Sequence, residues 1–149
     1  MTYKLANRIH KVQPSFTLQM ATRAAEMRAE GIDVINFSVG EPDYNTPSHI
    51  IAAGKKAMDD GFTKYTAGPG MIEFRKAICE KLERENGITY EPADILVSNG
   101  EKQSLYNVCQ ALFDEGDEVV VFRPYWVSFP EFVRLADAEP VLVETVAEN

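Results

Sequence analysis

The stretch ILVSNGEKQSLYNVCQALFDEGDEVVVF, residues 95–122, holds two short apolar runs on either side of a segment with helical spacing. The runs at residues 95–97 and 119–122 are typical of buried strands, which carry little alternation between apolar and polar residues. Between them, a helix over residues 101–113 is predicted by apolar residues three and four apart, namely Leu105, Val108, Cys109 and Leu112. Two strands joined through a helix indicate parallel pairing.

The same order continues downstream of this stretch. Pro130 stands near the start of another helical segment, and residues 141–143 form a third apolar run. Alternating strands and helices predict an α/β fold, with a mainly parallel sheet and helices on both faces. Three strands make a small sheet for two covered faces, so we expect a truncated part of a larger fold.

Two further segments precede this core. Pro14 and Ser15 open a predicted helix with the apolar Phe16, Met20 and Met27 on one side, and Gly31 can close it in a left-handed cap. Residues 33–37 are short and β-prone, but the Gly and Pro residues that follow break any regular element.

Two more helices are predicted between residues 46 and 87. Thr46 is the expected cap of the first, with Pro47 in its first turn, and Gly61 ends it; its expected inner face holds Ile50, Gly54, Ala57 and Met58. The second ends at Asn86 and Gly87, and its apolar face is formed by Met71, Phe74, Ile78 and Leu82.

The charge balance excludes some classes of partner. The chain has 149 residues and a net charge of −8, and its 15 basic residues are scattered among 23 acidic ones. Nucleic acids and anionic membrane surfaces are bound by clustered Lys and Arg, so neither is expected. An anionic small molecule is not excluded, because a pocket responds to its local field.

Cysteine usage and the N-terminus bear on the compartment. Cys79 and Cys109 form no Cys-x-x-Cys pair, and reduced, partly buried thiols are favoured over a disulfide or a metal site. No apolar run near residue 1 could serve as a signal peptide, and no apolar stretch reaches the ~18 residues of a membrane helix. We expect a cytoplasmic protein.

The turn of residues 98–102 is the strongest candidate for a binding site. It joins the carboxyl end of a predicted strand to a helix N-terminus, where free backbone N–H groups attract a phosphate. Gly100 would let the backbone approach closely. From spacing alone, an ordinary turn between strand and helix remains the simpler interpretation. The glycine patterns of dinucleotide-binding and P-loop proteins are absent.

Trp126 is the single tryptophan and directly follows the second predicted strand. Strand ends in open α/β sheets form ligand sites, so an aromatic platform is expected at the same sheet edge as the turn. A buried core tryptophan would be the default if Trp126 stood alone. His10 and His49 have no carboxylate or second histidine at ligand spacing, so no metal site is predicted.

Four motifs together resemble class I aminotransferases that use pyridoxal phosphate, and most closely their bacterial aspartate aminotransferase branch. They are SVGEPD at residues 38–43, KYT at 64–66, SNGEKQ at 98–103 and PYW at 124–126. Each motif is weak by itself, whereas their order and spacing are specific. The similarity runs from about residue 5 to the end of the chain.

The resemblance implies roles for individual residues. Gly100, Glu101 and Lys102 match the turn that holds the cofactor phosphate, and Trp126 matches the aromatic residue stacked on the pyridine ring. Tyr65 matches a tyrosine that reaches the phosphate of a neighbouring subunit, which implies a homodimer.

The substrate would be held by some of the same residues. Gly40 matches the glycine whose backbone lies against the substrate's α-carboxylate, and Trp126 stands beside that site. Lys102 matches a lysine that can meet the distal carboxylate of an acidic substrate, which favours aspartate or glutamate. Relatives that accept prephenate tend to carry a basic residue just before the Pro-Ser pair. Gln13 stands there instead, which argues against prephenate.

The resemblance also implies that the family's catalytic residues are missing from this chain. In the family, the Schiff-base lysine, the carboxylate that faces the pyridine nitrogen and the substrate-clamping arginine lie beyond residue 149. No catalytic residue is therefore expected in this chain. Residues 1–45 match an N-terminal arm and part of a small domain, and residues 46–149 match the first part of the large cofactor-binding domain.

The resulting hypothesis is an aminotransferase that moves an amino group between an amino acid, aspartate first, and a 2-oxo acid. Two alternatives remain open. One is another pyridoxal phosphate enzyme of the same fold, such as an aromatic aminotransferase or a carbon–sulfur lyase. The other is a non-catalytic α/β binding domain.

Overall fold

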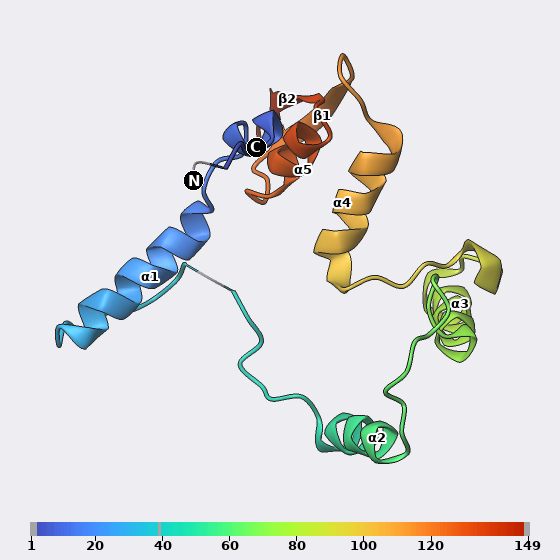
Figure 1. Cartoon of the computed structure of the whole chain (residues 1–149). Coiled ribbons are helices and arrows are strands. Elements are labelled where there is room, and N and C mark those ends of the chain that lie inside the picture. The colour runs from blue at the N-terminus through green and yellow to red at the C-terminus, as the bar shows by residue number, and fades with distance from the viewer. Residues whose placement is uncertain (1–2, 39, 148–149) are drawn as a thin grey trace. The chain divides into compact units, whose positions relative to one another are not determined.

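The computed structural model describes residues 3–38 and 40–147 (Figure 1). They divide into a first unit, Met1–Glu41 with Lys102–Asn149, and a second unit, Pro42–Glu101. The elements follow in the order η1 (Asn7–His10), α1 (Phe16–Ala29), α2 (Ser48–Asp59), α3 (Ile72–Asn86), η2 (Pro92–Asp94), α4 (Gly100–Leu112), β1 (Glu118–Arg123), α5 (Phe129–Leu135) and β2 (Glu139–Glu144).

The sheet of the first unit has two parallel strands. β1 pairs with β2 in a register that sets Val121 opposite Leu142 and Arg123 opposite Glu144. Parallel strands need a crossover, which α5 provides. The predicted parallel α/β arrangement is confirmed for these two strands.

The core of the first unit lies between α4, α5 and the sheet. Cys109 of α4 packs with Phe132 and Ala136 at the end of α5, and the half-buried Leu105, Phe113 and Phe129 surround them. α5 also contacts both strands. Val121 of β1 is buried, whereas its neighbour Phe122, which points to the opposite face as strand geometry requires, is 62% exposed.

Local signals account for the ends of α1. The Ser15 hydroxyl accepts a hydrogen bond from the Leu18 N–H at 3.4 Å, as expected of an N-cap. At the other end Gly31 has a φ of 83°, which a residue without a Cβ adopts at no steric cost. The predicted start and end of this helix are therefore confirmed.

The second unit is built around α3 and the loops beside it. The Arg75 guanidinium donates to the Pro92 carbonyl at 2.7 Å and so ties α3 to η2. Gly70 has a φ of 101°, and a Cβ there would lie 2.8 Å from two side-chain carbons of Val97. The backbone can approach Val97 this closely only because residue 70 is glycine.

The prediction of a strand at residues 95–97 is wrong for this structure, where those residues form no strand. Val97 donates its N–H to Pro69 at 3.0 Å, and Ile95 donates to Pro92 at 3.4 Å, within a turn. A strand needs a partner along its length, and no described strand pairs with these residues.

Two details of α2 also differ from the prediction. Pro47, not Thr46, is the N-cap, and no side chain caps the helix. The predicted inner face is open: Ile50 is 51% and Met58 is 63% exposed. No other described helix or strand packs closely on α2, so its apolar spacing has nothing to face. The spacing of apolar residues predicts that a segment is helical, but it does not predict which element packs against the helix.

Candidate functional site

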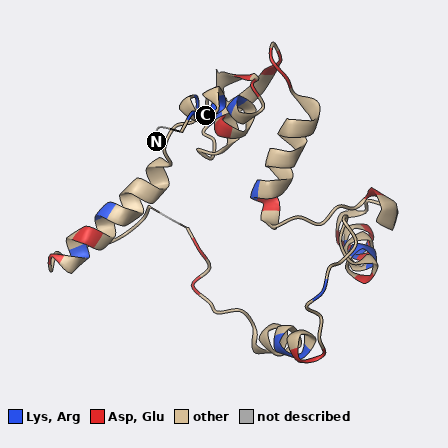
Figure 2. Cartoon of the chain, in the orientation of Figure 1, with Lys and Arg blue, Asp and Glu red and all other residues tan. Residues whose placement is uncertain are grey.

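The start of α4 has the properties of an anion-binding helix end. Its first residue, Gly100, has a φ of 77°, and beyond its chain neighbours and the helix's own backbone a Cβ there would meet no described atom within 4 Å. The helix dipole favours negative charge at such an end, where the Gly100 N–H donates to the Ser98 carbonyl at 2.8 Å. α4 carries its two charged residues, Glu101 and Lys102, in this first turn (Figure 2).

Lys102 is the unusual member of this turn. The dipole disfavours a cation at a helix N-terminus by about 0.3–1 kcal/mol, so Lys102 does not serve helix stability. Its ammonium instead lies over the Trp126 ring, 4.9 Å from the centroid. That distance is within cation–π range, which offsets the unfavourable position by about 0.5–1 kcal/mol.

Trp126 is held in place by two other aromatic rings. The Phe129 ring lies 5.6 Å away at an interplanar angle of 88°, and the Phe132 ring lies 6.1 Å away at 67°. Such edge-to-face contacts are the favoured geometry of aromatic pairs. Because Phe132 belongs to the buried core, it fixes the indole, while 41% of Trp126 stays exposed. An exposed, fixed aromatic surface suits a planar ligand.

Lys102 and Trp126 are in contact, but for a different structural reason than the sequence predicted. We expected the turn and the indole to meet at one edge of a sheet, through strands that end side by side. Residues 95–97 form no strand, and the contact arises because α4 packs on α5 through Cys109 and Phe132.

The carboxyl ends of the two strands are closed by polar contacts. The Arg123 guanidinium donates to the Glu144 carboxylate at 2.5 Å, and the Thr145 hydroxyl donates to the Arg123 carbonyl. The hydrogen bond from Arg123 to Glu144 raises the pKa of the arginine above its usual value. Arg123 is therefore engaged in holding the strand ends together.

The remaining predicted residues lie outside the helices and strands. Gly40 is exposed in an irregular segment of the first unit, and Tyr65 is fully exposed in a loop of the second. Val39, within the motif at residues 38–43, lies outside the described residues. The roles of Gly40, Tyr65, Gly100, Glu101, Lys102 and Trp126 remain predictions.

Both cysteines are buried and free. Burial in apolar surroundings raises the pKa of the Cys109 thiol, which disfavours the reactive thiolate. Among the described residues no group of His, Cys, Asp and Glu could hold a metal ion. In the same residues no helix has both the length and the apolar character to cross a bilayer.

Sequence reasoning did not single out Asp137. This residue follows α5, has a φ of 62° and accepts a hydrogen bond from Lys11 at 2.9 Å. A weak signal exists, since Asp tolerates left-handed backbone better than most residues. Nothing in the sequence pairs it with a lysine 126 positions away.

Comparison with known proteins gives one consistent family. A family model described as aminotransferase class I and II matches residues 32–149. Aspartate aminotransferase of Bacillus subtilis is 47% identical over 98% of this chain and 37% of its own length. An aspartate/prephenate aminotransferase of Cereibacter sphaeroides is 50% identical over 97% of this chain and 36% of its own.

A solved structure of aspartate aminotransferase from Thermus thermophilus with maleate superimposes with a TM-score of 0.92 at 43% identity, over 97% of this chain and 38% of that one. The chain thus spans little more than a third of the length of the relatives that it matches.

Proposed function

The chain belongs to the class I and II aminotransferases, and from this we propose that the whole protein moves an amino group between an amino acid and a 2-oxo acid through pyridoxal phosphate. We propose aspartate as the first amino donor. The observation that supports this most directly is the relatives' agreement: the sequences and the solved structure above are named aspartate or aspartate/prephenate aminotransferases.

The residues at the start of α4 fit a phosphorylated, planar cofactor. Backbone N–H groups of a helix N-terminus and a lysine ammonium are phosphate donors, and the exposed indole of Trp126 offers a stacking surface. We propose that Gly100, Glu101 and Lys102 hold the phosphate and that Trp126 stacks on the pyridine ring. When bound, the cofactor supplies an electron sink for bond breaking at the substrate's α-carbon.

Substrate binding would use residues of two different motifs. We propose that the backbone of Gly40 lies against the α-carboxylate and that Lys102 draws the distal carboxylate of an acidic substrate. The ammonium of Lys102 supports this, because no carboxylate of the described residues pairs with it. The Lys102 ammonium lies over the face of the Trp126 indole. This cation–π contact is weak, so moving the ammonium from the indole to an anion costs little free energy.

Prephenate is a second candidate substrate, as amino acceptor. Its support is the relative at 50% identity, which is named an aspartate/prephenate aminotransferase. Gln13 argues against it, since the resemblance places a basic residue there in prephenate-using members. Activity with prephenate in the Gln13→Lys variant but not in the wild type would assign specificity to this position.

We further propose a cytoplasmic homodimer in which Tyr65 reaches the phosphate site of the neighbouring subunit. The free cysteines agree with a reducing compartment. The proposed domain division is an arm and part of a small domain in residues 1–45, and part of the large domain in residues 46–149. Light scattering of the whole protein, wild type and Tyr65→Phe, tests the assembly separately from cofactor affinity.

The test of the function uses the whole protein with pyridoxal phosphate. Aspartate and 2-oxoglutarate should change the cofactor's absorbance in turn, and Trp126→Leu should retain less cofactor after gel filtration than Trp126→Phe, which keeps an aromatic face. A whole protein that never takes up the cofactor would refute the proposal and favour a non-catalytic binding domain. Uptake without transfer from aspartate would favour an aromatic aminotransferase or a carbon–sulfur lyase.

A further inference from the structure

Four helices are each followed by a residue in the left-handed backbone conformation. In three of them this residue is glycine, and in one it is not. α1, α2 and α3 are followed by Gly31, Gly61 and Gly87, with φ of 83°, 82° and 67°. α5 is followed by Asp137, with a φ of 62°. Glycine is the residue that adopts this conformation without a steric penalty, so a different requirement has placed an aspartate after α5.

The end of α5 has the same hydrogen bonds as a glycine-terminated helix. Asp137 donates its N–H to Arg134 at 3.1 Å, and Ala138 donates to Val133 at 3.2 Å. After α1, Ile32 donates to Met27 at 3.0 Å in the same way. The backbone therefore gives no reason for the aspartate side chain.

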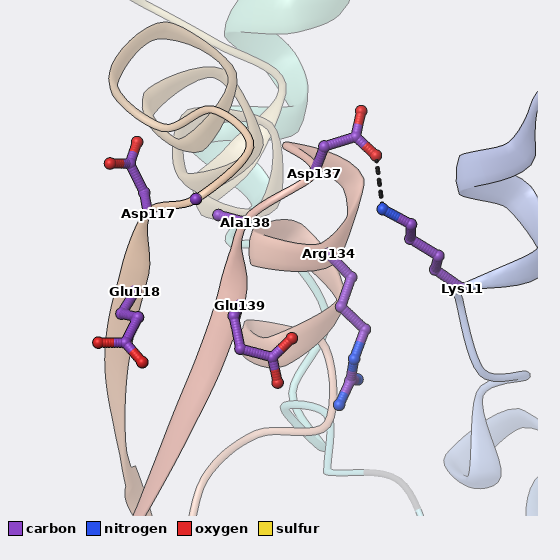
Figure 3. Close-up of a pocket in the computed structure, with 8 residues that line it drawn as sticks. Lys11, Asp117, Glu118, Arg134, Asp137, Ala138 and Glu139 are labelled. Atoms are coloured by element: carbon purple, nitrogen blue, oxygen red, sulfur yellow. Dashed lines mark hydrogen bonds and ion pairs between the residues drawn. The ribbon is translucent and has the colours of Figure 1, made fainter.

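The side chain of Asp137 does have partners. Lys11 donates to one carboxylate oxygen at 2.9 Å, and an Arg8 nitrogen lies 3.9 Å from the other. Figure 3 shows Lys11 reaching from the N-terminal segment to the carboxylate at the end of α5. The hydrogen bond from Lys11 lowers the pKa of Asp137, which keeps the carboxylate charged.

A second contact fixes the same segment further along. The Gln13 N–H donates to the Glu131 carboxylate of α5 at 3.0 Å, and Arg134 donates to the other oxygen at 2.5 Å. Between the segment and α5 lies a groove of about 550 Å³, lined among others by Phe16, Tyr125 and Phe132. One wall of this groove is the N-terminal segment itself.

We propose that Asp137 is a positioning residue: its carboxylate, presented by a left-handed backbone, anchors residues 8–16 on α5 and so forms the groove between them. Asparagine or glycine at this position keeps the backbone and removes the charge. This inference goes beyond the proposed function and does not depend on it, because the anchor and groove exist without cofactor or substrate.

Limited trypsin digestion of the chain tests the anchor at the bonds after Arg8 and Lys11. Cleavage follows the population of the released segment when release is fast. We expect Asp137→Gly and Asp137→Asn each to speed these two cuts about two- to five-fold, the range for exposed ion pairs. The cut after Lys4, outside the anchored residues, should keep its rate.

Two controls separate the anchor from general destabilisation. Asp60→Asn breaks the exposed Lys56–Asp60 pair of 2.6 Å in the second unit and should leave both cuts unchanged. Salt at about 0.5 M should speed the wild-type cuts but not those of Asp137→Asn, since it screens the attraction. Equal rates in the wild type and both Asp137 variants would overturn the proposal, whatever the outcome of the cofactor experiments.

Discussion

The Lys102 ammonium lies 4.9 Å from the centroid of the Trp126 ring, which joins the first turn of α4 to the segment that follows β1. Both residues belong to the motifs that the sequence assigned to the cofactor site. The contact couples a cation that the helix dipole disfavours to an aromatic face that the core fixes.

Lys102→Met should leave the stability nearly unchanged while altering the signal of Trp126. The variant loses a cation–π contact of about 0.5–1 kcal/mol and relieves a dipole penalty of about 0.3–1 kcal/mol, so the two effects nearly cancel. Trp126 is the single tryptophan, so all of the protein's tryptophan emission comes from the residue that Lys102 contacts. Lys76→Met on α3 is the control and should change neither quantity. Unchanged emission in Lys102→Met would mean that the contact is not populated.

Phe132→Ala should cost about 3–5 kcal/mol, because it empties a buried site between α4 and α5. Phe132 is 7% exposed, whereas Phe122 on the open face of β1 is 62% exposed. Phe122→Ala should therefore cost less than about 1 kcal/mol. Urea unfolding measures both free energies, and similar losses for the two variants would disprove the placement of the core.

Gly70→Ala should destabilise the second unit by at least about 2 kcal/mol, from its left-handed backbone and from overlap with Val97. Gly68 is the matched control: it lies in the same loop, its φ is not positive, and a Cβ there meets no atom within 4 Å. Thermal unfolding and hydrogen exchange at the Val97 amide measure the effect. A Gly70→Ala variant as stable as Gly68→Ala would contradict the close approach.

The anchor at Asp137 should be released by acid and not by mild alkali. Its folded-state pKa lies below the ordinary value of 3.8, so its contribution is present above that value and is lost as pH falls through the folded pKa. Arg8 and Lys11 face the carboxylate, and Asp117, Glu118, Arg134 and Glu139 line the same cavity. Hydrogen exchange of residues 8–16, corrected for its intrinsic pH dependence, should rise below pH ~4 in the wild type. In Asp137→Asn it should already be raised at pH 7.

Much of the local structure follows from residues a few positions apart. Ser15 and Gly31 mark the ends of α1, Gly87 ends α3, and Pro130 stands in the first turn of α5. The apolar runs at residues 119–122 and 141–143 became the paired strands. In each case the signal and its effect lie within one or two helical turns, or within one strand.

The same reasoning failed where a partner was required. Residues 95–97 have the composition of a buried strand, but no described strand pairs with them, and α2 has an apolar side that no described element covers. The spacing of apolar residues predicts which side chains of a segment could be buried. Whether they are buried depends on a neighbouring helix or strand that packs against them.

By itself, the sequence determined where most helices begin and end, which strands are parallel and to which family the chain belongs, because these depend on local conformational preferences and on ordered motifs. Only the tertiary structure decided that Lys102 rests on Trp126 and that Lys11 holds Asp137 across 126 positions. Contacts between such distant residues depend on how helices and strands pack, and no local preference encodes that packing.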